Sequence, residues 1–462
     1  MKTRFLTGAL ALGLAATALA QAPAKETPPA PGPARPFALP QPHRFALDNG
    51  LRVTLVPYGS VPKAVVRLAV RSGNAFESKD DVWLADLAGK LMREATKTKD
   101  ATAISTEAAR MGGTLDVTVG EDQTSVGGEV LSEFAAEMVG LVADIALNPT
   151  FPDSELARIK ADLARELSLQ KSQPQTLAQE AFRKALYGDH PYGRTFPAPE
   201  QLQGYTTARA RAFWEKNSGA ARSQLFVVGR FDAAAVEKAV RQAFAAMPKG
   251  TPAPSVDPRP HSERRIWLVD RPGAVQSTLV VGLPVVPPSD PDWIALQVTD
   301  TLLGGYFSSR ITANIREQKG YTYSPFSQLS TRVKDAYWAQ NADVTTAVTG
   351  ASLKEIFGEI DRLQAEPPPA AELQAVQNYL AGTFVLRNAT RGGIIGQLLY
   401  VDMQGLGDDY LRTYVEKVNA VTPAQVSEMA RKHLVDDRMI IAVVGDRKTI
   451  EEQLKPYGPL NP

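Results

Sequence analysis

The chain carries the stretch TTARARAFWEKNSGAARSQLFVVGRFDAAAVEKAVRQAF (206–244) and a second copy of its pattern, TPAQVSEMARKHLVDDRMIIAVVGDRKTIEEQL (422–454). Each copy predicts a helix capped by a threonine, a buried strand that ends in glycine, and a second helix. The strand-ending glycines lie 216 residues apart, and the threonines Thr206 and Thr422 keep the same offset. This spacing predicts two homologous halves of roughly 215 residues.

Further segments fit the same division. An apolar strand pattern stands near the start of each half, LRVTLV (51–56) and RIWLVD (265–270). Between the halves, PKGTPAPSVDPRPHS (248–262) is rich in proline and predicts a linker. The predicted boundaries are therefore 43–247 for the N-terminal half and 263–462 for the C-terminal half.

The order of elements in the first half indicates the fold class. GGTLDVTVGEDQTSVGGEVL (112–131) alternates like a strand pair with a polar turn at 120–122. A helix with one apolar face follows and stops before Pro149, and another runs from Ser154 to about residue 173. Strands followed by runs of helices favour an α+β layer over a doubly wound parallel sheet.

Composition limits the classes of partner. The chain has 462 residues, of which 44% are hydrophobic and 22% charged, with a net charge of +1 and no cysteine. This length suggests two to four domains, and the balanced charge argues against nucleic acid as the main partner. The lack of cysteine excludes disulfides, thiolate zinc sites and a cysteine nucleophile.

The N-terminus predicts export. Residues 1–20 contain two basic residues, a largely apolar core too short to span a bilayer, and a small-residue cleavage site at 18–20. They predict a cleaved signal peptide; the alternative, an amphipathic helix, would need a polar face that is absent. Residues 21–42 are rich in proline and alanine and predict a disordered tether. We expect an exported protein without a membrane span, in the periplasm or secreted.

Five segments beyond residue 43 follow one another in a specific order and spacing. They are DNGLRVTLVP, RSGNAFES, NPTFPDSELARIKADLARELSLQKSQP, HPYGR and LLGGYFSSRITANIREQKGYTYS. Together they resemble the insulinase-type (pitrilysin) metallopeptidases, in the short bacterial form related to the mitochondrial processing peptidase. The resemblance implies two α+β halves, each a pair of similar lobes, that pack as a clamshell around a peptide.

The resemblance also implies a metal site that this chain has lost. Active members bind zinc through a helical His-x-x-Glu-His motif and a later glutamate. Here Asp86, Gly89 and Lys90 replace the first histidine, the glutamate base and the second histidine. Glu166 matches the later glutamate, but one carboxylate cannot hold a catalytic zinc. We therefore expect no cofactor on this chain.

A charge pair is expected in place of the metal. Asp86 and Lys90 are one helical turn apart, which suits an ion pair. Glu166 shares a helical stripe with Ile159 and Leu163, so we expect it to point inward and to pair with Lys90, because a buried carboxylate needs a partner. The alternative is a solvated helix face with unrelated charges.

The four histidines, at positions 43, 190, 261 and 433, have no spacing typical of a metal motif. His190 lies in HPYGR, for which a structural turn is the better interpretation. A peptidase with a different metal site is therefore poorly supported.

The second half carries a different signal in ITANIREQKGYTYSPF (311–326). Gly320 predicts the C-terminal cap of a helix, followed by a strand at 321–323. The resemblance implies that Arg316 and Tyr323 form a pair facing the zinc site across the cleft. A guanidinium and a phenol can donate to a scissile carbonyl and to the developing oxyanion. A helix-end charge and a strand-core tyrosine are the alternatives.

The preceding LLGGYFSSR contains two adjacent glycines, Gly304 and Gly305. They predict a flexible entry to the Arg316 segment, or merely a turn.

A chain that lacks the metal ligands but keeps the arginine–tyrosine pair resembles the non-catalytic partner in heterodimeric members of the family. The expected function is to bind peptide and to supply Arg316 and Tyr323 in trans to a catalytic subunit with an intact His-x-x-Glu-His motif and its zinc. The alternative is a scaffold or binding protein of the same fold with no role in proteolysis.

Overall fold

The computed structural model describes residues 40–255, 257–407 and 409–461. The predicted signal peptide (1–20) and residues 21–39 of the predicted tether lie outside this part of the chain. These described residues form one compact unit. Within the described ranges, none of the helices is both long enough and apolar enough to cross a bilayer.

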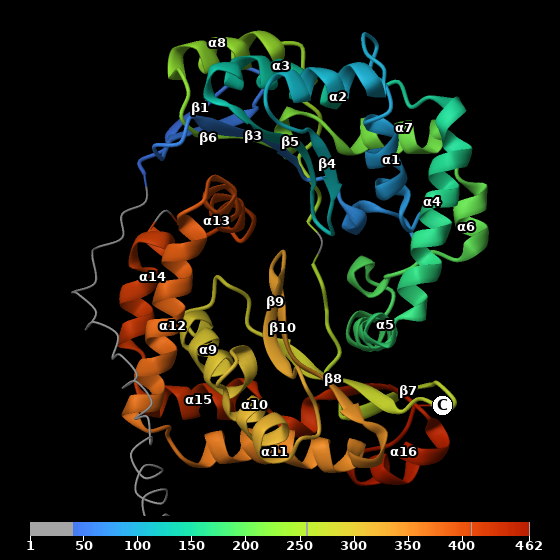
Figure 1. The fold of residues 1–462 in the computed structure, drawn as a ribbon, viewed down its shortest axis with the longest axis vertical. Coiled ribbons are helices and arrows are strands. Elements are labelled where there is room, and N and C mark those ends of the chain that lie inside the picture. Colours follow the sequence, from blue (N-terminus) through green and yellow to red (C-terminus); the bar gives the residue numbers. More distant parts are fainter. Residues whose placement is uncertain (1–39, 256, 408, 462) are drawn as a thin grey trace, which may run out of the picture. The chain divides into compact units, whose positions relative to one another are not determined.

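Two mixed β-sheets organise this unit, one in each half (Figure 1). The first has the order β1-β2-β6-β3-β5-β4, with bounds β1 His43–Ala46, β2 Arg52–Pro57, β3 Lys63–Val70, β4 Asp116–Val119, β5 Thr124–Leu131 and β6 Ser223–Gly229. The second has the order β7-β11-β8-β10-β9, with bounds β7 Arg265–Asp270, β8 Gln276–Val285, β9 Phe326–Arg332, β10 Asp335–Thr345 and β11 Ile440–Gly445. The predicted fold of two similar halves that mix helices and strands is confirmed.

The sequence repeat forms equivalent parts of the two sheets. The repeated strands are β6 and β11, and each pairs in parallel with the strand near the start of its half, β2 or β7. The other strand pairs are antiparallel. Both predicted threonine caps are confirmed, because Thr206 accepts from the Arg209 N–H and Thr422 from the Gln425 N–H.

Sixteen α-helices among the described residues surround the sheets. In the first half they are α1 Leu84–Met92, α2 Ala101–Arg110, α3 Ala135–Leu147, α4 Asp153–Ser172, α5 Pro174–Tyr187, α6 Pro199–Gly204, α7 Thr207–Asn217 and α8 Ala233–Ala243. In the second half they are α9 Trp293–Asp300, α10 Arg310–Thr312, α11 Thr349–Ala365, α12 Ala370–Asn388, α13 Arg391–Met403, α14 Asp409–Ala420, α15 Pro423–His433 and α16 Arg447–Leu454. The predicted strand pair is β4–β5, and the two helices predicted after it are α3 and α4.

Both faces of the first sheet are buried, and one of them is covered by the other half. Along β3, Val66 and Leu68 belong to the core shared with α3 and α8, whereas Val65 and Ala69 pack with Ile395 of α13. Side chains alternate across a strand, so a strand covered on both faces is apolar at nearly every position.

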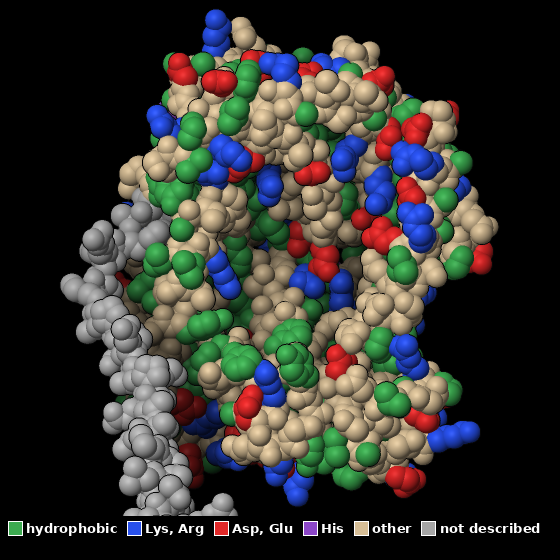
Figure 2. All heavy atoms as spheres, in the orientation of Figure 1, with side chains coloured by type: hydrophobic (Ala, Val, Ile, Leu, Met, Phe, Trp, Pro, Cys, Tyr) green, Lys and Arg blue, Asp and Glu red, His purple; other side chains and the backbone are tan. Residues whose placement is uncertain are grey.

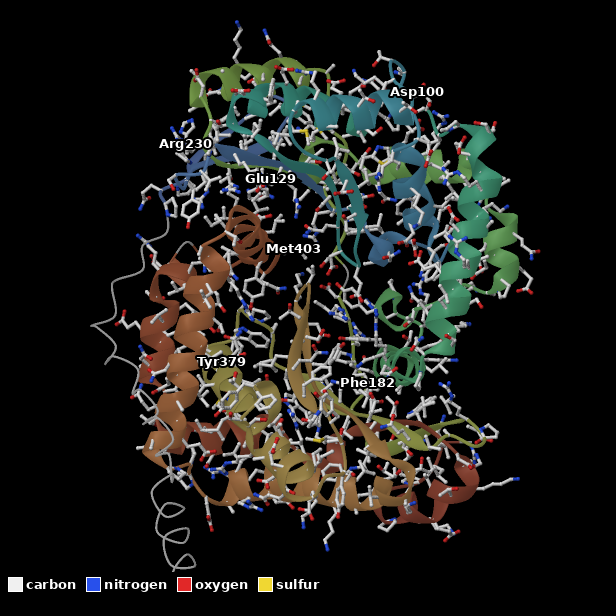
Figure 3. All side chains as sticks on the ribbon, in the orientation of Figure 1. Asp100, Glu129, Phe182, Arg230, Tyr379 and Met403 are labelled. Carbon is white, nitrogen blue, oxygen red and sulfur yellow. The ribbon has the colours of Figure 1, made fainter. Side chains whose placement is uncertain are left out.

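The second sheet is covered in the same way by a helix of the first half. Phe182 of α5 packs against Tyr337 of β10, with ring centroids 5.3 Å apart, in a core that includes Val280 and Ala442 (Figure 3). Each half therefore completes the core of the other, as the positions of α5 and α13 in Figure 1 show.

Charged groups also join the halves. Glu121, in the turn between β4 and β5, forms ion pairs with Arg183 of α5 at 2.7 Å and with Arg332 at the end of β9. Figure 2 shows side chains of both charges in the hollow between the halves. The pair with Arg332 ties a turn of the first sheet to a strand end of the second, whereas the pair with Arg183 lies within the first half.

The HPYGR segment forms a short 3-10 turn, Pro191–Gly193, in agreement with its structural interpretation. The His190 Nδ1 accepts from the Tyr192 N–H at 3.2 Å, and the Tyr192 hydroxyl donates to Asp122 at 2.6 Å. Burial lowers the pKa of His190. His190 therefore stabilises the turn by accepting the hydrogen bond from the Tyr192 N–H.

Candidate functional site

Glu77, a residue that the sequence analysis did not single out, anchors the start of α1. Its carboxylate accepts from the backbone N–H groups of Trp83 at 3.1 Å and of Ala85 at 2.8 Å. These are donors that a helix leaves unpaired at its N-terminus. Burial raises the pKa of Glu77 to about 8. The acidic residue in RSGNAFES is the sequence signal that could have indicated this cap.

Asp86, in the first turn of α1, is held by an amide. Asn74 Nδ2 donates to Asp86 Oδ2 at 2.7 Å and to Glu77 Oε1 at 3.1 Å, so one amide bridges two carboxyl groups. Burial raises the pKa of Asp86, and the nearby charge of Glu166 adds to the rise. Among the described residues, no ion pair joins Asp86 to Lys90, so the expected one-turn pair is wrong, because Asp86 hydrogen-bonds Asn74 instead.

Lys90 and Glu166 lie together, on α1 and α4. The Lys90 Nζ is 3.5 Å from Glu166 Oε2, and the two side chains are 43% and 45% exposed. Gln170 Nε2 also donates to Glu166 Oε1, at 3.2 Å. The expectation of an inward-pointing Glu166 is wrong, since only Ile159, Leu163 and Leu167 of α4 are buried and Glu166 lies at the edge of their stripe.

Gly89 marks the place where the family's glutamate base would stand. A Cβ atom at this position would lie 2.7 Å from Val119 Cγ2 and 3.4 Å from Val117 Cγ1, both on edge strand β4. A 2.7 Å carbon–carbon contact is well inside the 3.5–4.0 Å at which carbon atoms attract one another. The chain has therefore filled this space with the valines of β4 as well as losing the carboxylate.

The residues of this site do not suit a zinc ion. Lys90 presents an ammonium where a ligand would stand, Gly89 has no donor, and Val119 occupies the adjacent space. Within residues 40–255, 257–407 and 409–461, no cluster of three or more histidine, cysteine, aspartate or glutamate residues could hold a metal ion. No metal-dependent step can be derived for α1.

Arg316 and Tyr323, the second candidate pair, lie in contact. Arg316 is on a π-helical turn, Ala313–Gln318, and its Cζ lies 5.0 Å from the centre of the Tyr323 ring. The Arg316 Cζ also lies 4.3 Å from the centre of the Phe307 ring, a residue that the sequence analysis missed. The Arg316 side chain is 23% exposed, whereas Tyr323 is 80% exposed.

The turn at Gly320 brings this pair together. Gly320 has φ 64° and donates to the Arg316 carbonyl at 3.1 Å, as expected of a glycine that ends a helix. The predicted strand at 321–323 is wrong, because only Thr322 forms a single bridge, to Val344, and β9 begins at Phe326. The Thr322 hydroxyl donates to the Asp343 carbonyl at 2.6 Å and anchors the segment beside β10.

The Gly304–Gly305 segment is packed and helical, so the expected flexible loop is wrong. Both glycines end a π-helical turn, Thr301–Gly305, that continues from α9. A Cβ at Gly304 would lie 2.6 Å from the hydroxyl oxygen of Ser327, and one at Gly305 would lie 2.9 Å from Oδ2 of Asp300. Because glycine has no Cβ, it allows Ser327 and Asp300 to approach the backbone this closely.

The structure thus forms two separate groups from the predicted residues. One contains Asp86, Gly89, Lys90 and Glu166, and the other contains Arg316 and Tyr323. Among the described residues, no hydrogen bond, ion pair or ring contact links the two groups.

Family sequence models identify the relatives of this chain. The model described as "Insulinase (Peptidase family M16)" matches residues 53–200, and the one described as "Peptidase M16 inactive domain" matches residues 205–380. The chain belongs to the insulinase (M16) peptidase family. Its α1 site lies within the first match, and Arg316 and Tyr323 lie within the second.

Individual M16 relatives align over almost the whole chain. An uncharacterized zinc protease of Mycobacterium tuberculosis is 26% identical over 446 residues, which cover 92% of this chain and 99% of that protein. The uncharacterized zinc protease YmxG of Bacillus subtilis is 22% identical, over 85% of this chain and 96% of that protein.

Solved structures agree with this fold. A peptidase M16 inactive domain from Pseudomonas fluorescens superposes with a TM-score of 0.81 at 25% identity, covering 88% of this chain and 98% of that one. A protease from Helicobacter pylori gives a TM-score of 0.81 at 18% identity, covering 88% and 100%, and this likeness concerns the fold alone.

Proposed function

We propose that this M16 protein is the non-catalytic subunit of a two-chain zinc peptidase. It binds peptide and supplies Arg316 and Tyr323 to a zinc site on a partner chain with an intact His-x-x-Glu-His motif. The observation that carries the proposal is the contrast between two sites of one chain. The space of the base at Gly89 is filled by Val119, while Arg316 and Tyr323 stand together, with the tyrosine open to solvent.

The chemistry of the pair supports this role. Among the described residues, the terminal nitrogens of Arg316 meet no acceptor, and its only ion pair is from Nε to the neighbouring Glu317 at 3.2 Å. A guanidinium with free N–H donors and an adjacent phenol can bind a peptide carbonyl and the oxyanion that develops from it. Such donors need a nucleophile to be useful, and α1 of this chain has none.

We also propose that the complex works outside the cytoplasm, in the periplasm or as a secreted assembly. This part of the proposal rests on the signal-like residues 1–20.

The test is isolation of the protein from its own host with an affinity tag at the C-terminus. We expect a second chain with an intact His-x-x-Glu-His motif to co-purify, zinc in about 1:1 ratio to that chain, and peptide cleavage only when both chains are present. Cleavage by this chain alone, or a complex whose partner has no such motif, would contradict the proposal. The second result would instead identify a scaffold of the same fold.

A further inference from the structure

Arg316 contacts two exposed aromatic rings. Its guanidinium carbon lies 4.3 Å from the centre of the Phe307 ring and 5.0 Å from that of Tyr323. The rings are 67% and 80% exposed, and the arginine is 23% exposed. One exposed ring is ordinary on a protein surface, but two exposed rings in contact with one partly buried guanidinium form a localised group that a ligand can contact.

The two rings limit where the Arg316 side chain can lie. Both ring centres are within 5.0 Å of its Cζ, and its terminal nitrogens have no acceptor among the described residues. A free arginine side chain samples many rotamers, and ordering them at the moment of binding costs free energy. Because the two rings already order the Arg316 side chain in the folded protein, this free energy is not lost when a peptide binds.

The backbone around Phe307 is itself fixed. The segment follows the packed glycines Gly304 and Gly305, and Tyr306 lies against Tyr379 of α12 with ring centroids 5.3 Å apart. The Ser309 N–H donates to the Tyr306 carbonyl at 3.1 Å and closes the turn. Figure 2 shows hydrophobic side chains gathered near α9, and Figure 3 labels Tyr379.

We propose that Phe307 is a positioning residue for Arg316 in peptide binding. Phe307 holds the guanidinium against Tyr323 so that its N–H donors meet a peptide carbonyl in a fixed direction. This inference rests on the proposed function, because it assumes that Arg316 contacts a peptide.

The first experiment uses the complete two-chain complex and a quenched fluorescent peptide that it cleaves. We expect Phe307→Ala to lower kcat/KM by about 10- to 100-fold, since a small misplacement of a binding group can cost that much. Phe307→Tyr keeps a ring over the guanidinium and should retain the activity. In the Arg316→Ala background, Phe307→Ala should cost nothing more, because the two residues act as one unit.

Phe326 provides the matched control. It is an exposed phenylalanine of the same region, 48% exposed, and no contact joins it to Arg316 in the described structure. Phe326→Ala should leave kcat/KM unchanged. An equal loss from Phe326→Ala and Phe307→Ala would reduce Phe307 to general apolar surface and overturn the positioning role.

A second experiment needs no partner. Urea unfolding of the single and double variants of Phe307→Ala and Arg316→Ala should reveal a coupling of about 2- to 5-fold in the unfolding equilibrium constant. The pair Phe326→Ala and Arg316→Ala should show none.

The outcomes separate this inference from the proposed function. Full activity of Phe307→Ala alongside loss in Arg316→Ala would overturn the positioning role alone, as would a coupling of zero. Full activity of Arg316→Ala would overturn the proposed function, whatever the coupling between the two residues.

Discussion

The α1 region and the Arg316 region differ in what surrounds their polar groups. Around α1, each carboxyl group has a protein partner: Asn74 bridges Asp86 and Glu77, and Lys90 pairs with Glu166. Around Arg316, two aromatic rings contact the guanidinium, and its terminal nitrogens have no acceptor among the described residues.

The two regions of this fold therefore differ in how far their polar groups are satisfied within the protein. A polar group whose bonds are all satisfied within the protein is structural, whereas one whose donors are ordered but unpaired is ready for a ligand. Four predictions test this difference between the α1 region and the Arg316 region.

The largest expected effect concerns the pair itself. Arg316→Ala combined with Tyr323→Phe should lower the peptide-cleaving rate of the two-chain complex by about a hundredfold or more, because each donor acts on charge that develops in the transition state. Co-purification with the catalytic chain should be unaffected. Full activity of this double variant would favour the scaffold alternative, and failure to assemble would make the pair structural.

The second prediction tests whether the space at Gly89 is truly filled. Gly89→Ala should lower the free energy of unfolding by about 1–3 kcal/mol, because the new methyl group meets Val119 at 2.7 Å. In a Val119→Ala background the same change should stabilise the protein by up to about 1 kcal/mol, since alanine favours a helix over glycine. Denaturant titration measures both values, and the same sign in the two backgrounds would contradict the packing argument.

The third prediction concerns the buried cap of α1. Burial raises the pKa of Glu77 from an ordinary value of 4.5 to about 8 in the folded protein. Between these values the folded state keeps a proton that the unfolded state has lost, so the contribution of Glu77 to stability is fully present below about pH 4.5 and is lost as the pH rises to about 8. The slope is at most about 1.4 kcal/mol per pH unit.

Glu77→Gln is the control for this pH dependence. Glutamine has nearly the same shape and does not titrate, so the difference in unfolding free energy between the two proteins should change over this pH range. A constant difference from pH 5 to pH 8 would mean that Glu77 is ionised throughout.

The smallest effect is expected for the ion pair between Lys90 and Glu166. Lys90→Met should change the free energy of unfolding by less than about 1 kcal/mol, because both partners are nearly half exposed. What loss there is should shrink in about 1 M salt, which screens exposed charges. A loss of about 3 kcal/mol, the value for a buried pair, would show that the site is closed in solution.

The fold followed largely from local sequence signals. The repeated helix–strand–helix pattern, the threonine caps and the β4–β5 strand pair all depend on short-range periodicity and capping, which a sequence displays directly. The family resemblance placed Asp86, Gly89, Lys90, Glu166, Arg316 and Tyr323. It also implied the Arg316–Tyr323 pair, and Lys90 was expected beside Glu166; both contacts are present. It did not indicate Asn74 or Phe307, since contacts between distant segments leave no local pattern.

The errors have the same origin. Glu166 has the spacing of a buried residue, but how far α4 turns towards α1 is decided by the packing of Leu163 and Leu167. The two glycines at 304 and 305 suggest flexibility in a sequence, whereas in the fold they allow close contact with Ser327 and Asp300. The sequence alone does not distinguish a glycine that gives flexibility from one that allows close packing.

The sequence by itself determined the two halves, their sheets and the loss of the metal ligands, because periodicity, caps and ligand identity are properties of residues and their spacing. Three contacts became known only from the tertiary structure. Val119 fills the space beside Gly89, Asn74 rather than Lys90 binds Asp86, and Phe307 packs against Arg316. These contacts depend on how segments far apart in the chain pack together. Their geometry is set by the packing of whole sheets and helices, which no single stretch of residues encodes.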